Sequence, residues 1–174
     1  TKILISWYDE NKRTFLWRET KEPYKIWLSE VILQQTRTQQ GLPYYKRFLE
    51  TFPTVKDLAL ASEDSVLKLW QGLGYYSRAR NLHSTAQYIY KECGGIFPTN
   101  FDSLLKLKGI GDYTASAISS ICYDIPEAVV DGNVFRFLSR YFGINTPINS
   151  SQAHQEFKSK AMSLMDATQP GKFN

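Results

Sequence analysis

The stretch that decides the fold is Leu107-Lys108-Gly109-Ile110-Gly111-Asp112-Tyr113-Thr114-Ala115. Its two glycines predict a tight turn between two segments whose apolar residues have helical spacing. Because glycines lack side chains, backbone N–H groups and the start of the second helix can approach a phosphate closely. About one helix further along the chain stands Val130-Asp131-Gly132-Asn133-Val134. A carboxylate that follows such a phosphate-binding turn points to chemistry on nucleic acid.

Helical spacing of apolar residues continues through almost the whole chain, and no run alternates as a β-strand would. We expect one helix around Ile3, Leu4 and Trp7 and another that begins at Ser62. The other expected helices cover residues 24–39, 43–52, 55–61, 76–93, 101–107, 112–123, 133–142 and 151–167. The sequence therefore predicts an all-α fold with short loops.

Composition limits the possible functions. The 174 residues, 43% of them hydrophobic, suit one compact unit or two small ones. A net charge of +4 permits a polyanionic partner without requiring one. No apolar run is long enough to cross a membrane, and no signal peptide is recognisable. The two cysteines, Cys93 and Cys122, lie in helical segments and show no zinc spacing, which favours reduced thiols.

The glycine turn has a second copy earlier in the chain. Gln71-Gly72-Leu73-Gly74-Tyr75-Tyr76-Ser77 resembles Lys108-Gly109-Ile110-Gly111-Asp112-Tyr113-Thr114, and helical patterns flank both. One such turn is often only a tight connection, but two matched turns favour a shared ligand. Tyr75 follows the first turn, where it either packs under a loop or stacks on bases.

Glu30 lies on or beside the apolar stripe of the helix expected over residues 24–39. A carboxylate there is costly unless it is paired or protonated, so burial should raise its pKa and make it a candidate general acid. The alternative is a glutamate at the edge of the stripe that reaches solvent. Gln34, Gln35 and Thr36 place three polar groups at the end of this helix, where they are suited to hydrogen-bond base edges.

Asp131 also has two interpretations. It follows Ala128-Val129-Val130 and precedes an expected helix, which is the usual setting of an N-cap aspartate. An N-cap carboxylate near helix N–H groups can also stabilise positive charge on a sugar. Asn133 is placed to orient this carboxylate.

Several motifs together resemble the MutY-type adenine DNA glycosylases of the endonuclease III superfamily. The catalytic helix of that family is similar to Ser29-Glu30-Val31-Ile32-Leu33-Gln34-Gln35-Thr36. The other similar segments are Trp17-Arg18, Gly72-Leu73-Gly74-Tyr75-Tyr76-Ser77-Arg78-Ala79-Arg80-Asn81-Leu82 and Val130-Asp131-Gly132-Asn133-Val134. The turn at residues 108–111 resembles the family's helix–hairpin–helix. The resemblance runs from about Trp7 to Asn174.

The resemblance implies a two-lobed all-α fold with the active site between the lobes. A six-helix barrel would span residues 15–126 and contain the helix–hairpin–helix at about 101–123. Residues 1–14 with 127–174 would form the second lobe, truncated before the iron–sulfur region of the family. The chain begins without Met, and we expect it to be a piece of a longer protein.

The implied reaction is hydrolysis of the N-glycosidic bond of adenine mispaired with 8-oxoguanine or guanine in double-stranded DNA. By resemblance, Glu30 protonates the adenine, Asp131 stabilises the sugar cation, and Tyr113 and Asn133 hold the two carboxylates. The residues implied to contact DNA are Trp17, Arg18, Gln35, Thr36, Tyr75, Lys108, Gly109, Gly111 and Thr114. The carbonyls of Leu105, Leu107 and Ile110 are implied to hold a cation.

Position 113 separates branches of the superfamily. Relatives with lyase activity carry lysine there, whose amine forms a Schiff base with the sugar, and a phenol cannot form an imine. We therefore expect a monofunctional glycosylase. The alternatives are an endonuclease III-like pyrimidine glycosylase-lyase, disfavoured by Tyr113 and the Gln34-Gln35-Thr36 run, and a non-catalytic helix–hairpin–helix DNA-binding module, disfavoured by the presence of both Glu30 and Asp131.

The resemblance also implies a setting for the protein. The family's [4Fe-4S] cluster uses four cysteines that this chain lacks, and the chemistry itself requires no cofactor. We expect a monomer that does not associate with membranes. Its location would be the bacterial cytoplasm with the nucleoid, or the nucleus or mitochondria of a eukaryote.

Overall fold

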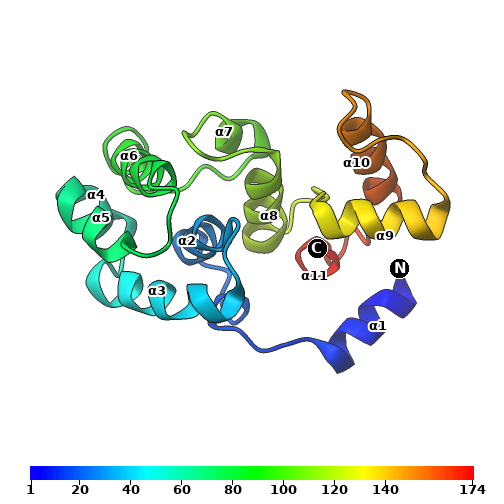
Figure 1. Ribbon diagram of the computed structural model, residues 1–174, viewed down its shortest axis with the longest axis horizontal. Coiled ribbons are helices and arrows are strands. Elements are labelled where there is room, and N and C mark those ends of the chain that lie inside the picture. Colours follow the sequence, from blue (N-terminus) through cyan, green and yellow to red (C-terminus); the bar gives the residue numbers. More distant parts are fainter. The chain divides into compact units, whose positions relative to one another are not determined.

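The computed structural model describes all 174 residues and contains only helices, which confirms the all-α prediction (Figure 1). The helices are α1 (Lys2–Asn11), the 3-10 helix η1 (Leu16–Arg18), α2 (Pro23–Leu33), α3 (Thr38–Thr51), α4 (Val55–Leu60), α5 (Glu63–Trp70), α6 (Ser77–Glu92), α7 (Phe101–Leu105), α8 (Asp112–Tyr123), α9 (Gly132–Phe142), α10 (Ala153–Leu164) and α11 (Pro170–Phe173). None of them has both the length and the apolar character that a membrane span requires.

The chain forms two compact units. The central unit is Phe15–Gly111, and the terminal unit combines Thr1–Thr14 with Asp112–Asn174. The central unit ends earlier than the barrel expected over residues 15–126, because α8 packs against α11 within the terminal unit. Asn174 strengthens that packing by donating from Nδ2 to Ser120 Oγ at 2.8 Å. The barrel with its limit at residue 126 stays a prediction.

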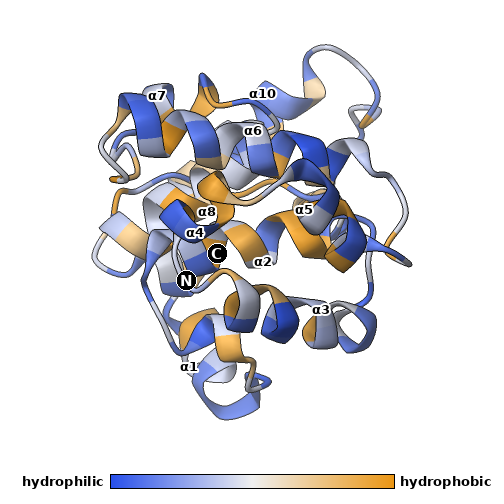
Figure 2. Ribbon diagram, turned by 90° about the vertical axis from the view of Figure 1, so that its left-hand side faces the viewer, coloured by the Kyte–Doolittle hydropathy of each residue, from blue (hydrophilic) through white to orange (hydrophobic).

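The core of the central unit is rich in aromatic side chains. Helix α2 buries most of its length, and Figure 2 shows its long hydrophobic stretches in orange. The Trp27 ring meets Phe97 edge-on with centroids 5.4 Å apart, and Phe48 meets Trp70 at 5.8 Å. Such edge-to-face pairs add to the stabilisation that burial of the rings provides. This core fixes the end of α2 and the turn after α5.

Helix α2 ends at Leu33 rather than at the expected residue 39, and α3 begins at Thr38. Gln35, with φ +54°, breaks the helix between them. The second helix was expected to begin at Pro43, yet Gly41 and Pro43 both lie inside α3. A Cβ on Gly41 would approach Leu33 Cδ2 to 2.8 Å and Ile32 Cγ2 to 3.3 Å, so the glycine allows α3 to pack closely on α2.

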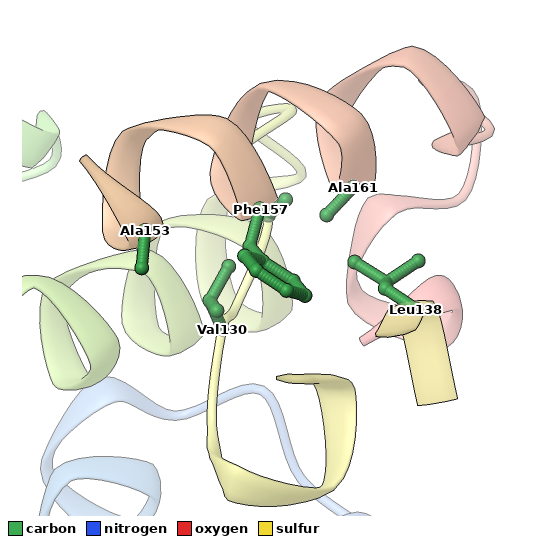
Figure 3. Packing of buried hydrophobic residues seen from close by; sticks show 6 residues of the cluster. Val130, Leu138, Ala153, Phe157 and Ala161 are labelled. Atoms are coloured by element: carbon green, nitrogen blue, oxygen red, sulfur yellow. The ribbon is translucent and has the colours of Figure 1, made fainter. Parts of the chain in front are cut away.

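A second apolar core lies in the terminal unit between α9 and α10 (Figure 3). Phe157 is fully buried at its centre, next to Leu138 and Val130, and meets Phe135 edge-on at 4.7 Å. Because Val130 is anchored in this core, the next residue, Asp131, has a fixed place at the start of α9.

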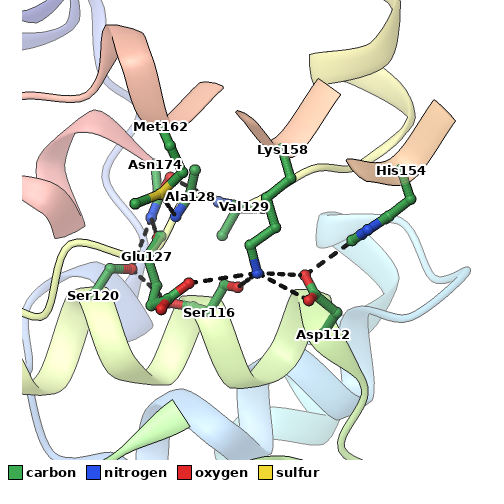
Figure 4. Close-up of polar contacts among 10 residues, drawn as sticks. All are labelled: Asp112, Ser116, Ser120, Glu127, Ala128, Val129, His154, Lys158, Met162 and Asn174. Atoms are coloured by element: carbon green, nitrogen blue, oxygen red, sulfur yellow. Dashed lines mark hydrogen bonds and ion pairs between the residues drawn. The ribbon is translucent and has the colours of Figure 1, made fainter. Parts of the chain in front are cut away.

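Lys158 ties α10 to the start of α8 (Figure 4). Its Nζ atom lies 2.9 Å from Asp112 Oδ2, 3.4 Å from Glu127 Oε2 and 3.2 Å from Ser116 Oγ. One ammonium group thus neutralises two carboxylates in a partly buried place, where such a pairing is required to offset desolvation. The N-terminus of α8, which directly follows Gly111, is therefore held to α10.

Candidate functional site

The two glycine turns begin with the same local geometry. We call Gln71–Tyr76 the first glycine turn and Lys108–Gly111 the second. Leu73 N donates to Trp70 O at 3.1 Å, and the corresponding bond from Ile110 N to Leu107 O is also 3.1 Å. The leading glycines both have positive φ, +99° at Gly72 and +78° at Gly109. The repeat seen in the sequence therefore begins as the same turn. The two copies then diverge, because Gly74 and Tyr75 also have positive φ, +70° and +46°, whereas the second turn has no positive φ after Gly109.

In both turns the leading glycine has a packing role and the trailing glycine has none. A Cβ on Gly72 would lie 2.5 Å from the Tyr44 hydroxyl oxygen, and one on Gly109 would lie 2.8 Å from Asn81 Cβ. A Cβ on Gly111 would meet nothing within 4 Å. Gly111 is exposed, so its backbone is accessible to a ligand.

The second glycine turn is held against α6 and the end of α2. Thr85 Oγ1 donates to the backbone carbonyl of Lys108 at 2.7 Å. The side chain of Lys108 is exposed. Beside these contacts, a cavity of about 30 Å³, enough for a water molecule, remains between the turn and the two helices. Its walls are Trp27, Val31, Gln34, Arg78, Asn81, Leu82, Lys108 and Gly109.

Glu30 lies on α2, as expected, and is partly buried between fully buried neighbours. Ser29 is 1% exposed and Val31 4% exposed, so Glu30 is more accessible than the residues on either side of it. This placement fits both interpretations of the sequence, an edge glutamate and a desolvated acid. The rise in its pKa stays a prediction.

Asp131 is the N-cap of α9, and its carboxylate accepts three hydrogen bonds. Oδ1 accepts from the backbone N–H groups of Asn133 at 2.9 Å and Val134 at 2.8 Å. Oδ2 accepts from Asn133 Nδ2 at 3.0 Å, while Asn133 Oδ1 accepts from Arg136 Nη1 at 3.3 Å. These bonds fix the orientation of a negatively charged group that stays partly exposed. The cap and the orienting role expected of Asn133 are thus compatible.

Gln35 and Tyr75 are both exposed and both have left-handed backbone conformations, with φ +54° and +46°. Non-glycine residues rarely adopt such values, and when they do the position is often functional. Thr36 is partly buried and donates from Oγ1 to Gln34 O at 3.3 Å.

The remaining expected residues are divided between surface and core. Arg18 is exposed, and Tyr113 is 38% exposed near the start of α8. Trp17 is buried, stacked on Phe15 with centroids 4.9 Å apart. Thr114 is only 2% exposed, so its side chain belongs to the core and any contact it makes with DNA would come from its backbone. The apolar pattern does not separate these core positions from surface ones.

Arg78 donates hydrogen bonds to the residues that precede Gln35 and Tyr75. The sequence pattern does not distinguish it from the other basic residues. One signal is available: a cation in the first turn of a helix is unfavourable beside the positive end of the helix dipole, so it indicates other partners. Burial lowers the pKa of the Arg78 guanidinium from its usual value, and the nearby Tyr75 opposes this shift. Arginine nevertheless stays protonated at neutral pH.

No group of three or more His, Cys, Asp or Glu side chains is placed to hold a metal ion. Cys93 and Cys122 form no disulfide. The two cysteines of this chain therefore do not fit a four-cysteine iron–sulfur cluster.

Comparison with known proteins gives the wider setting. Residues 28–162 match the family model described as HhH-GPD superfamily base excision DNA repair protein. An adenine DNA glycosylase of Buchnera aphidicola is 39% identical over 100% of this chain and 50% of its own length. The adenine DNA glycosylase of Homo sapiens is 42% identical over 98% of this chain and 33% of its own. The chain thus spans about half the length of the bacterial relative.

Solved structures share the fold. A thermostable thymine-DNA glycosylase superposes with a TM-score of 0.89 and 27% identity, over 99% of this chain and 82% of that one. An endonuclease III in a non-covalent DNA complex gives a TM-score of 0.81 at 19% identity, over 99% and 79% of the two chains. The helices, the paired glycine turns and the match over residues 28–162 agree, and the chain belongs to the HhH-GPD superfamily of base excision DNA repair proteins.

Proposed function

We propose that this chain is the catalytic part of a monofunctional DNA glycosylase that hydrolyses the N-glycosidic bond of adenine mispaired with 8-oxoguanine or guanine. The observation that carries the proposal is the Asp131 carboxylate, held by two backbone N–H groups and by Asn133 Nδ2. A negative group oriented in this way suits a sugar that becomes positively charged as the base leaves. The 39% and 42% identity to adenine DNA glycosylases supports adenine as the base.

The reaction begins with the adenine outside the duplex, because its glycosidic bond is not accessible inside the base stack. Glu30 donates its proton to the base, at N7, so that adenine leaves as a neutral molecule. The bond between N9 and the sugar breaks with its electron pair on the base, and Asp131 stabilises the resulting oxocarbenium ion. Water then adds to the sugar carbon and loses a proton, which restores the acid. Tyr113 and Asn133 hold the two carboxylates in place.

DNA binding would involve both glycine turns. The backbone at Gly109 and Gly111 approaches a phosphate, aided by the Lys108 ammonium, the backbone of Thr114 and a cation on the carbonyls of Leu105, Leu107 and Ile110. Gln35, Thr36 and Tyr75 enter the base stack around the mispair, and Arg18 with Trp17 borders the base. The open space beside Gly111 supports a phosphate contact there.

The proposed partner is double-stranded DNA, bound by one copy of the protein. Its place in the cell would be with the chromosome, in the bacterial cytoplasm or in the nucleus or mitochondria of a eukaryote.

A single-turnover assay tests the function. The wild-type chain is mixed in excess with duplexes that contain adenine opposite 8-oxoguanine or guanine, at low salt because phosphate contacts weaken steeply with ionic strength. We expect adenine release by the wild type and by Glu50→Gln, an exposed glutamate on α3, but not by Glu30→Gln. Release that survives Glu30→Gln would exclude the mechanism. Binding without release would favour the DNA-binding module, and release of thymine or a damaged pyrimidine would favour a different glycosylase.

A further inference from the structure

Arg78 connects two segments that are about forty residues apart in the sequence. Its Nη1 atom donates to the carbonyl oxygens of Val31 and Ile32, both at 3.1 Å, and to that of Gln34. Its Nη2 atom donates to the carbonyl oxygens of Leu73 at 3.1 Å and Gly74 at 3.4 Å. One guanidinium group therefore joins the C-terminal end of α2 to the first glycine turn.

The acceptors of Arg78 lie next to Gln35 and Tyr75, two of the exposed residues with left-handed backbones. The Gln34 carbonyl directly precedes Gln35, and the Gly74 carbonyl directly precedes Tyr75. The Tyr75 carbonyl in turn accepts from the backbone N–H of Arg78 at 2.9 Å. Because each left-handed conformation is disfavoured for a side-chain-bearing residue, the surrounding bonds have to hold it.

Neighbouring aromatic rings keep the guanidinium in this position. The Cζ atom of Arg78 lies 5.1 Å from the centre of the buried Trp70 ring and 5.8 Å from that of Tyr75. Trp70 Nε1 donates to the Gly74 carbonyl at 3.0 Å, so the ring and the guanidinium share an acceptor. The Tyr75 ring itself is 67% exposed. The guanidinium and the Trp70 ring are thus held by hydrogen bonds and packing, while the side chains of Tyr75 and Gln35 are exposed.

We propose that Arg78 is a positioning residue that holds Gln35 and Tyr75 together as a rigid pair, so that both side chains enter the base stack of a duplex at once. The guanidinium does not contact the reacting atoms. Its planar fork reaches carbonyls on both segments at the same time, which the single ammonium of lysine cannot reproduce. This inference rests on the proposed function, because it assumes that Gln35 and Tyr75 meet DNA.

Arg78→Lys tests the inference, because it keeps the positive charge and removes the fork. The control is Arg80→Lys on the same helix, where an exposed arginine lies 3.3 Å from Glu63 Oε1. The first measurement is hydrogen–deuterium exchange in peptides that contain residues 34–36 and 73–76, without DNA. The second is the fluorescence rise of 2-aminopurine placed beside an adenine:8-oxoguanine mispair, recorded on rapid mixing as the base unstacks. Affinity for a matched duplex is measured alongside.

We expect exchange in both peptides of Arg78→Lys to become about tenfold faster or more, since local opening governs exchange. The fluorescence rise should be lost, while affinity for the matched duplex changes by less than about threefold, because phosphate contacts supply most non-specific binding. Arg80→Lys should match the wild type in all three measurements. A general loss of structure would instead reduce matched-duplex affinity and the fluorescence rise together.

Unchanged exchange, faster exchange in only one of the two peptides, or a fluorescence rise that persists in Arg78→Lys would each overturn the inference. None of these measurements requires bond cleavage. A wild-type chain that unstacks the base but releases no adenine would therefore contradict the proposed function alone.

Discussion

Gly109 lies against Asn81 so closely that a Cβ at position 109 would stand 2.8 Å from Asn81 Cβ. The same contact places the second glycine turn on α6, while Gly111, two residues later, faces open space. The two positions of this motif therefore differ in whether the protein itself requires glycine there. Gly109 is required by packing and by its φ of +78°, and Gly111 by nothing within the protein.

This difference predicts opposite effects of two alanine substitutions. Gly109→Ala should lower the free energy of unfolding by about 1–3 kcal/mol, through left-handed strain and the clash with Asn81. Gly111→Ala should change it by less than about 0.5 kcal/mol, yet weaken binding to an undamaged duplex, because the methyl group blocks close approach of a phosphate. Urea denaturation and fluorescence anisotropy measure the two effects. Unchanged binding by Gly111→Ala would remove this glycine from the DNA contact.

Two substitutions at Asp131 separate its structural role from its chemical one. Asp131→Ala should cost about 1 kcal/mol of stability, because α9 loses its N-cap. Asp131→Asn keeps an oxygen for the N–H groups of Asn133 and Val134, so its stability should stay within about 0.5 kcal/mol of the wild type. Both should abolish adenine release in single turnover, since neither has a negative charge. An active Asp131→Asn variant would mean that this residue is only a helix cap.

Lys158→Met tests the polar link between α10 and α8. Removal of the ammonium leaves the Asp112 and Glu127 carboxylates, 2.9 and 3.4 Å from Nζ in the wild type, without their shared cation. We expect a loss of about 1–3 kcal/mol, because breaking one side of a partly buried charge cluster is costly. Thermal denaturation of this variant is compared with Lys91→Met, which removes an exposed lysine at the end of α6. Equal losses would show that the cluster contributes nothing measurable.

Buried tyrosines predict the response to alkaline pH. Burial raises the pKa of Tyr45 from 10.0 to about 12, because the interior disfavours the phenolate. Between these two values the folded chain binds more protons than the unfolded chain, so the free energy of unfolding falls as pH rises. Tyr45→Phe should reduce this fall by about 1–3 kcal/mol between pH 9 and 12, whereas Tyr88→Phe, at an exposed position, should not. Urea denaturation across the range gives the slopes, and identical slopes for wild type and Tyr45→Phe would contradict the prediction.

Local features of the sequence predicted the local structure well. The repeated glycine pattern predicted two turns between helices, and the position of Asp131 before a helical pattern was typical of an N-cap, which the structure shows. Contacts between distant segments were not predictable. Helix α2 ends six residues earlier than expected, where Arg78 binds its carbonyls. Helix α3 contains Pro43 in its interior. Both outcomes depend on contacts with segments that are distant in the sequence.

The candidate site shows the same limit. Glu30 and Asp131 were candidates because one lies on an apolar stripe and the other before a helix, and their catalytic roles stay predictions. The burial of Trp17 and Thr114 was not visible, because an aromatic or hydroxyl residue beside a motif has the same pattern at the surface and in the core. Arg78 could not be distinguished from the other basic residues, because its partners are backbone carbonyls, which every residue has.

We predict that Tyr113 decides whether this chain also cleaves the DNA strand. Its phenol cannot form an imine, so borohydride should trap no covalent complex between the wild-type chain and abasic DNA. Tyr113→Lys places an amine near the N-terminus of α8, 38% exposed in the wild type, where the helix dipole favours the neutral, nucleophilic form. We expect this variant to give a borohydride-trapped band and some strand cleavage, with Tyr88→Lys, in the middle of α6, as the control. Efficient trapping by the wild-type chain would show that another amine attacks the sugar, and the monofunctional assignment would then be wrong.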